Sequence, residues 1–212
     1  MSLKPGDAAP DFKIIDTNGK VVTLKDLKGK KIWMCLYRVS ACPLCNMQVG
    51  RVKKQLKELT STGMEIISVF ESDQEEIKKY AGTQAEPGFP IYVPHPDTFD
   101  GYRYAVYSEY GSVRFCPTSV IGLGAPYHMV VDCKMYPAFF GYGGNPMFGC
   151  PLMCAFPQLF CGSRAMTMPT DVLIENGKIV KVSYGNVPGS HIPMDEVMEF
   201  AGVKAPANMS MH

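Results

Sequence analysis

Short apolar runs alternate with segments of mixed polarity over the first half of the chain, and this alternation predicts strands and helices in turn. Two apolar runs flank an Asn-Gly dipeptide, which favours a two-residue turn, so residues 12–24 should form a β-hairpin. Residues 30–38 and 64–70 are mostly apolar, as in strands that are buried on both faces of a sheet. A further strand is expected at 89–96, where prolines limit its length.

Between and after these strands the apolar positions follow the period of a helix. One stripe with alternating spacings of four and three predicts a helix that ends near Gly63; it consists of Cys45, Val49, Val52, Leu56 and Leu59. Further helices are expected at 72–82, 100–111 and 193–202. A second hairpin is expected at 170–185, again around an Asn-Gly turn.

The order of these elements predicts an α/β fold. Early strands that alternate with helices should be parallel, and the late hairpin must be antiparallel, so the central sheet is expected to be mixed, with helices on both faces. We expect one domain over residues 1–212, with an irregular Cys- and Met-rich insertion at about 112–165 that shows no periodic pattern.

Composition and charge narrow the class of protein. The formal net charge of +1 does not indicate binding to nucleic acid or to an anionic membrane. The first residues contain no apolar stretch of signal-peptide length, so a cytoplasmic location is expected. No charged residue lies between Lys134 and Arg164, but prolines and glycines interrupt that segment, and we therefore predict no membrane span there.

The candidate chemistry centres on Cys42 and Cys45, which follow a predicted buried strand and begin a predicted helix. Unpaired N–H groups and the helix dipole favour a thiolate at this position, and Arg38 adds positive charge. Pro43 suits the first turn of a helix. A Cys-x-x-Cys pair in a βαβ setting favours a redox role for the two cysteines. The alternatives are that they form half of a zinc site or that they only pack in the core.

Pro169 stands directly before the strand of the second hairpin. If the Met168–Pro169 peptide bond is cis, Pro169 should face the Cys-x-x-Cys turn and leave the backbone of Met168 free to pair with a substrate. An ordinary proline at the entry of a strand is the alternative.

The other six cysteines fall into two groups. Cys35 lies inside an apolar strand and is expected to pack. The remaining five lie in the insertion and could bind zinc or an iron–sulfur cluster, or else pack as buried thiols; they are Cys116, Cys133, Cys150, Cys154 and Cys161. We expect His191, just before the last helix, to cap or pack.

Taken together, the entry segment 5–38, the SACPLC turn and the MPTDVLIENGKIVKVSYG hairpin resemble the thioredoxin fold, and more closely the AhpC/TSA (peroxiredoxin-like) family. The R-x-x-x-C-x-x-C pattern and a late G-x-H-x-P-x-D-E pattern are similar to its selenoprotein-U-like branch. The resemblance covers residues 4 to about 110 and 165 to 202. It implies a thioredoxin-like fold in which the insertion precedes the cis-proline strand.

The chain departs from the P-x-x-x-T-x-x-C motif of peroxiredoxins. If Cys45 is aligned with the motif cysteine, Cys42 replaces the threonine and Arg38 replaces the proline. If Cys42 is aligned with it, Val39 replaces the threonine and Cys35 replaces the proline. The resemblance therefore implies a thiol-dependent oxidoreductase whose dithiol reduces disulfides or peroxides, with no required cofactor. It further implies a thiol reductant such as the thioredoxin or glutathione system, and a homodimer is conceivable. The alternative is a zinc- or cluster-binding electron-transfer or interaction protein.

Overall fold

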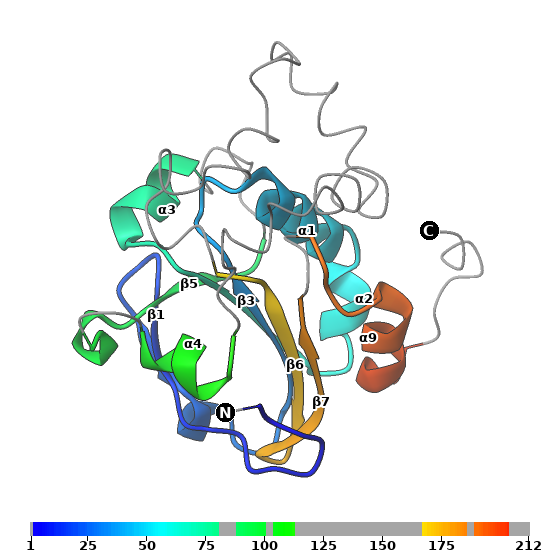
Figure 1. Ribbon diagram of the computed structural model, residues 1–212. Coiled ribbons are helices and arrows are strands. Elements are labelled where there is room, and N and C mark those ends of the chain that lie inside the picture. Colours follow the sequence, from blue (N-terminus) through cyan, green and yellow to red (C-terminus); the bar gives the residue numbers. More distant parts are fainter. Residues whose placement is uncertain (1, 81–87, 101–103, 113–166, 186–188, 204–212) are drawn as a thin grey trace, which may run out of the picture.

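A mixed β-sheet of seven strands forms the centre of the described part of the protein (Figure 1). The structure is a computed structural model, and it describes residues 2–80, 88–100, 104–112, 167–185 and 189–203. The strands are β1 (Lys13–Asp16), β2 (Val21–Thr23), β3 (Lys31–Tyr37), β4 (Glu65–Phe70), β5 (Ile91–Pro94), β6 (Thr170–Glu175) and β7 (Lys178–Tyr184). Their order in the sheet is β2-β1-β5-β4-β3-β6-β7.

The directions of the strands confirm the predicted mixed sheet. β3, β4 and β5 are parallel to one another, whereas β1 and β6 run antiparallel to their neighbours β5 and β3. Both predicted hairpins are present, as β1–β2 and β6–β7. The second turns at Asn176 and Gly177, whose positive φ values of 51° and 73° are those that a tight hairpin turn requires.

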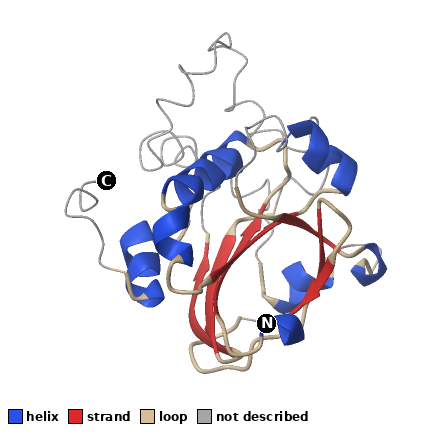
Figure 2. Cartoon of the chain, turned by 180° about the vertical axis from the view of Figure 1, so that it is seen from behind, coloured by secondary structure: helices blue, strands red, loops and turns tan. Residues whose placement is uncertain are grey.

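Helices cover both faces of the sheet, as predicted (Figure 2). The α-helices are α1 (Pro43–Lys54), α2 (Leu56–Thr60), α3 (Gln74–Tyr80), α4 (Ala105–Glu109) and α9 (Met194–Ala201), and short 3-10 helices lie at Leu24–Leu27 and Pro96–Thr98. Side chains of α1, α2, α3 and α9 pack in one buried cluster, whereas α4 contributes to a second cluster on the other face.

β3 contributes side chains to both buried clusters, one on each face of the sheet. Its odd-numbered residues Trp33, Cys35 and Tyr37 lie in the first cluster, and the even-numbered residues between them lie in the second. All six residues from 32 to 37 are buried, which explains the nearly continuous apolar run in the sequence. The hydroxyl of Tyr107 on α4 donates to the carbonyl oxygens of Tyr37 at 2.8 Å and Val69 at 3.0 Å, and so holds the carboxyl ends of β3 and β4 together.

The predicted single helix after β3 is instead two helices. The backbone leaves the helical region at Gln55 (φ −106°, ψ 8°), and its N–H reaches the carbonyl of Val52 at 3.1 Å in a tighter turn. The apolar stripe continues through this break, because Leu59 on α2 remains fully buried beside Val52 of the same cluster. The hydrophobic pattern thus predicted correctly which face is buried. Its prediction of one continuous helix was wrong.

The insertion predicted at about 112–165 lies almost entirely outside the described residues, as does the uncharged segment that we rejected as a membrane span. In the described ranges, no helix is long and apolar enough to cross a membrane.

Candidate active site

The Cys-x-x-Cys turn lies at the carboxyl end of β3, where the chain passes into α1 (Figure 1). Cys42 is the N-cap residue of α1 and Pro43 is its first helical residue, in the positions that the sequence predicted. The extended backbone of Cys42 (φ −74°, ψ 116°) is typical of an N-cap. The backbone N–H groups of Leu44 and Cys45 interact with Cys42 and favour its negative form, as expected at the start of a helix.

Hydrogen bonds from buried polar side chains hold this turn in place. The amide of Asn46 donates to the carbonyls of Ser40 at 2.7 Å and Cys42 at 3.0 Å. The backbone N–H of Ser40 donates to the hydroxyl of Ser72 at 2.9 Å, which ties the turn to the end of β4. Asn46 is 6% exposed and Ser72 is 1% exposed, so these bonds are shielded from water. A turn held in this way presents its sulfurs in one geometry.

The two thiols have opposite proton affinities, although they stand three residues apart. A hydrogen bond from the Cys45 side chain, the positive charge of Arg38 and the backbone N–H groups of the helix start lower the pKa of Cys42 to about 5, against its burial. One guanidinium nitrogen of Arg38 lies 3.7 Å from the Cys42 sulfur. Burial raises the pKa of Cys45 well above its ordinary value, and so does its hydrogen bond with Cys42. Cys42 is therefore a thiolate at neutral pH and Cys45 a thiol.

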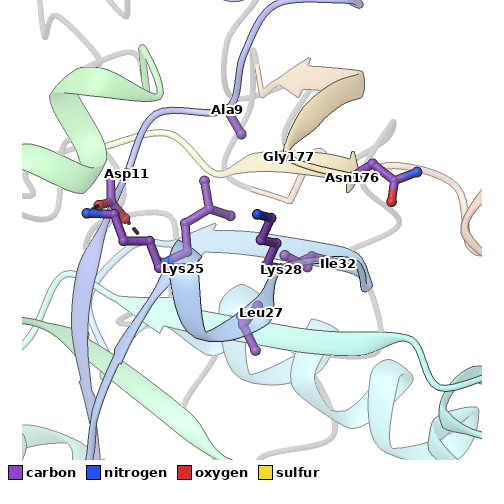
Figure 3. Close-up of a pocket in the computed structure, with 9 residues that line it drawn as sticks. Ala9, Asp11, Lys25, Leu27, Lys28, Ile32, Asn176 and Gly177 are labelled. Atoms are coloured by element: carbon purple, nitrogen blue, oxygen red, sulfur yellow. Dashed lines mark hydrogen bonds and ion pairs between the residues drawn. The ribbon is translucent and has the colours of Figure 1, made fainter.

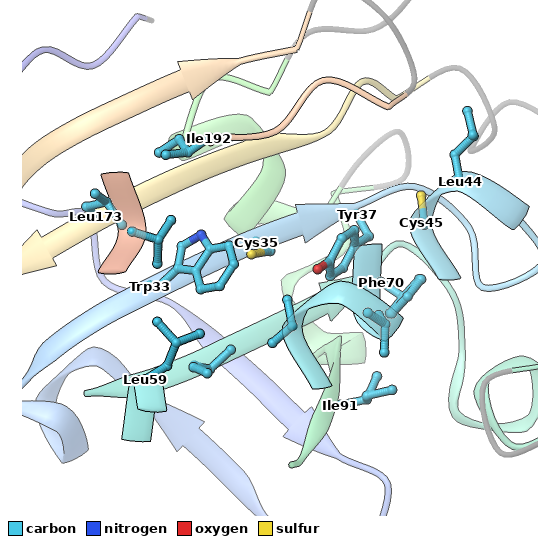
Figure 4. Close-up of a cluster of buried hydrophobic side chains, with 14 of the residues drawn as sticks. Trp33, Cys35, Tyr37, Leu44, Cys45, Leu59, Phe70, Ile91, Leu173 and Ile192 are labelled. Carbon is cyan, nitrogen blue, oxygen red and sulfur yellow. The ribbon is translucent and has the colours of Figure 1, made fainter. Parts of the chain in front are cut away.

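The two cysteines also differ in their exposure to solvent. Cys42 is 6% exposed, and Cys45 is completely buried among apolar side chains (Figure 4). The three cysteines of the described residues, these two and Cys35, are free thiols. A buried thiol reacts only after it has lost its proton, and a thiolate at a helix start is ready to react.

Sequence reasoning missed a buried carboxylate behind Arg38. Glu71 directly follows β4, is 1% exposed, and accepts a hydrogen bond from the hydroxyl of Thr167. Its backbone N–H donates to the carbonyl of Arg38 at 3.0 Å. The signal that could have found it is a charged residue placed directly after an apolar strand, at the sheet edge where the Cys-x-x-Cys turn also lies.

The prediction of a cis bond before Pro169 is wrong. The described part of the chain contains no cis peptide bond, so Met168–Pro169 is trans. Pro169 directly precedes β6, and its carbonyl accepts a hydrogen bond from the N–H of Gly185 at 2.9 Å. The trans form found here is the one that X–Pro bonds intrinsically prefer. Pro169 still lies at the same end of the sheet as the thiols, because Thr170 pairs with Leu36.

The predicted alternative metal ligands cannot be placed, since all five cysteines from Cys116 to Cys161 lie outside the described residues. Within the described ranges, no three Cys, His, Asp or Glu side chains come together as metal ligands. Cys35 is fully buried on β3, as expected, but it lies opposite a carboxylate, Asp171 of β6. No local pattern in the sequence indicates that Asp171 lies beside Cys35.

A shallow cavity of about 360 Å³ lies at the opposite end of the sheet, near the start of β3 (Figure 3). Lys25, Lys28 and the Asn176–Gly177 turn line it, and Lys25 pairs with Asp11 at 3.6 Å. No cysteine lines this cavity. The cavity therefore lies at the opposite end of the sheet from Cys42 and Cys45.

Comparison with known proteins agrees with this arrangement. Peroxiredoxin Bcp from Escherichia coli (strain K12) is 28% identical over 79 residues, which are 37% of this chain and 51% of that protein. Thiol-disulfide oxidoreductase ResA from Bacillus subtilis (strain 168) is 37% identical over 68 residues, which are 32% of this chain and 37% of that protein. The chain thus matches about half the length of these curated relatives, or less.

Similarity of structure extends over nearly the whole chain. The crystal structure of peroxidoxin BcpB from Mycobacterium tuberculosis aligns with a TM-score of 0.59 at 14% identity, and the alignment covers 94% of this chain and 97% of that one. This likeness confirms the predicted thioredoxin-like fold. The model of the AhpC/TSA family matches residues 5–135, which is more than half of the sequence. The chain therefore belongs to the AhpC/TSA family.

Proposed function

We propose that the protein is a thiol–disulfide oxidoreductase in which Cys42 attacks and Cys45 resolves. The observation that carries this proposal is the difference between the two thiols: Cys42 stands at a helix N-cap, 3.7 Å from the Arg38 guanidinium, whereas Cys45 is buried and protonated. The similarity to proteins named peroxiredoxin and thiol-disulfide oxidoreductase supports thiol-based redox chemistry in general.

The reaction has two exchange steps. The Cys42 thiolate attacks one sulfur of a substrate disulfide, the substrate S–S bond breaks, and one substrate thiolate leaves with the electron pair. Cys45 then loses its proton and attacks the Cys42 sulfur, which closes the Cys42–Cys45 disulfide and releases the second thiolate. The substrate gains two electrons and the protein pair loses two. An external thiol reductant, such as the thioredoxin or glutathione system, would return the pair to its reduced form.

Hydroperoxides are a second candidate substrate, because two of the similar proteins carry the names peroxiredoxin and peroxidoxin. In that reaction the Cys42 thiolate attacks the O–O bond and forms a sulfenic acid while an alcohol leaves, and Cys45 condenses with it to release water. Val39 and Cys35 stand where a peroxiredoxin motif has threonine and proline, so this site lacks the threonine hydroxyl of that motif. We therefore favour disulfides over peroxides.

Serine replacements test the assignment. We expect Cys42→Ser to abolish turnover of both substrates, and Cys45→Ser to stop turnover but to accumulate a mixed disulfide on Cys42, visible by mass spectrometry. If Cys42→Ser retains turnover, the assignment is wrong, and a mixed disulfide on Cys45 would show the reverse order. Serine at all five cysteines from Cys116 to Cys161 is the matched control, and its unchanged turnover would show that the pair works alone. Metal analysis and a visible spectrum of anaerobically purified protein test the alternative hypothesis that the protein binds zinc or an iron–sulfur cluster.

A further inference from the structure

A row of buried polar side chains crosses the sheet on the face that α1, the helix with the two thiols, also covers. Asp171 of β6 lies opposite Cys35 of β3, and Cys35 lies opposite Ser68 of β4. None of the three is more than 1% exposed. Burying polar groups in an apolar cluster lowers stability unless they are bonded, so such a row calls for a functional explanation.

The carboxylate of Asp171 organises this row. It accepts a hydrogen bond from the backbone N–H of Ile192 at 2.7 Å, and His191 Nδ1 lies 3.0 Å from one of its oxygens. The two side chains are 0% and 4% exposed. A carboxylate at Nδ1 holds the imidazole as the tautomer with a proton there, and leaves the lone pair on Nε2. In the described part of the structure, that buried Nε2 has no hydrogen-bond partner.

Tyr37 packs against the imidazole of this pair and lies in the same buried cluster as Cys45. Its ring centre lies 5.4 Å from that of His191 and 4.8 Å from that of Phe70, on which it stacks. Tyr37 and Cys45 belong to the same buried cluster (Figure 4), and Tyr37 directly precedes Arg38 in the chain. A change of charge at His191 therefore acts electrostatically through a water-excluded cluster, which also contains the Cys45 thiol.

The proposed reaction creates a need for such a group. Cys45 is fully buried and protonated, so it must release a proton before it can attack the mixed disulfide at Cys42. The other titratable groups of the row, Cys35 and Tyr37, are themselves protonated, because burial raises the pKa of each well above its ordinary value. A neutral imidazole held by a carboxylate gains a proton readily, since the carboxylate stabilises the imidazolium.

We propose that the Asp171–His191 pair stores the proton that Cys45 releases in the resolving step, acting through Tyr37. The inference rests on the proposed function. Cys45 loses its proton and His191 gains one at Nε2; the new Cys42–Cys45 bond forms, the substrate thiolate leaves, and the imidazolium later returns its proton to solvent or to that thiolate. His191 and Asp171 are positioning residues, because the structure gives neither a hydrogen bond to the Cys42 or Cys45 sulfur.

Charged groups on the neighbouring elements do not compete for this role. Lys181 of β7 and Glu196 of α9 form an ion pair with each other and are each about 40% exposed. Arg38, on the approach to α1, lies beside Cys42 and stays charged at every working pH. On this helix-covered face, Asp171 and His191 form a buried carboxylate–imidazole pair, with side chains that are 0% and 4% exposed.

The test separates the two steps with the aromatic disulfide dithiobis(nitrobenzoate), which releases one coloured thiolate in each step. His191→Asn keeps a donor for Asp171 and removes Nε2, and Asp171→Asn removes the carboxylate. We expect the first phase to keep its rate in both variants. We expect the second phase to slow at least tenfold near neutral pH and to recover as pH rises, so that its midpoint moves to higher pH. The same substitution at His95, the N-cap residue of the short 3-10 helix at Pro96–Thr98, should leave both phases unchanged.

Three outcomes overturn the inference: an unchanged second phase, a second phase slowed equally at every pH, or a wild-type imidazole titration by NMR that is identical in the reduced and oxidised proteins. The NMR comparison needs no variant, so it decides the matter even if the substitutions prevent folding. Failure of the proposed function looks different, because the wild type itself would then release no second coloured thiolate.

Discussion

Replacing Cys45 with alanine or with serine tests why Cys42 is a thiolate. The largest cause of its lowered pKa is the hydrogen bond from the Cys45 side chain, ahead of the charge of Arg38. Serine keeps a donor at that position, whereas alanine removes it. The two substitutions therefore separate the effect of the donor from the effect of changing the side chain.

The size of the effect follows from the energy of a hydrogen bond to a charged group. Such a bond contributes about 1.5–3 kcal/mol, which corresponds to about one to two units of pKa. From the present value of about 5, Cys45→Ala should therefore raise the pKa of Cys42 to about 6–7. At about pH 6 the thiolate fraction would fall from roughly nine-tenths to between about a half and a tenth. Cys45→Ser should leave the pKa within about half a unit of that of the wild type.

The measurement is the pH profile of iodoacetamide alkylation, followed on the Cys42 peptide by mass spectrometry so that the other cysteines do not contribute. Unfolded protein provides the reference for an unperturbed thiol. A Cys45→Ala midpoint that stays near the wild-type value would refute the donor argument and leave the helix start and Arg38 as the causes. A serine variant shifted as far as the alanine variant would show that packing, and not donation, sets the pKa.

Three further perturbations address the turn, the sheet edge and the thiolate. Asn46→Ala removes a side-chain hydrogen bond from each of the buried carbonyls of Ser40 and Cys42, although the Cys42 carbonyl keeps the backbone N–H of residue 46; chemical denaturation should show a loss of about 1–3 kcal/mol, against less than about 0.5 for the exposed Asn18→Ala. Gly185→Ala places a Cβ 2.8 Å from a backbone oxygen and should lower stability by about 1–3 kcal/mol, whereas Gly50→Ala, in open space on α1, should raise it by about 0.5–1. Because the pKa of Cys42 is lowered on folding, the reduced protein should lose stability as pH falls from about 9 towards about 5, and Cys42→Ser should flatten that slope.

The sheet could be predicted from the sequence because its signals are local. The Asn-Gly turns, the apolar strand before the thiols and the proline after Cys42 each act within a few residues. The break at Gln55 left no such signal, because the stripe that buries Leu59 continues across it. The predicted cis bond before Pro169 failed for another reason: a proline permits that isomer, but the path of the surrounding chain decides it.

Contacts between distant residues could not be predicted. Asp171 and His191 stand twenty residues apart, and Glu71 and Thr167 ninety-six apart. Asp171 meets Cys35 because β6 inserts beside β3, a neighbour relation that depends on the order of the whole sheet. Polar residues inside apolar strands were visible in the sequence, but their partners were not. The place of Cys42 and Cys45 at the start of a helix was therefore predictable, and their buried polar neighbours were not.

The difference in burial between Cys42 and Cys45 supports the proposal that Cys42 attacks first. For Cys45 to attack first, it would have to ionise where it is 0% exposed and next to the negative charge of Cys42. Both conditions oppose ionisation, and the charge of Arg38 already favours the outer sulfur. Once Cys42 is bound in a mixed disulfide, however, that negative charge is gone, and the main remaining obstacle to ionising Cys45 is desolvation. The same arrangement that holds the resolving thiol back in the reduced protein thus releases it as soon as the first step is complete.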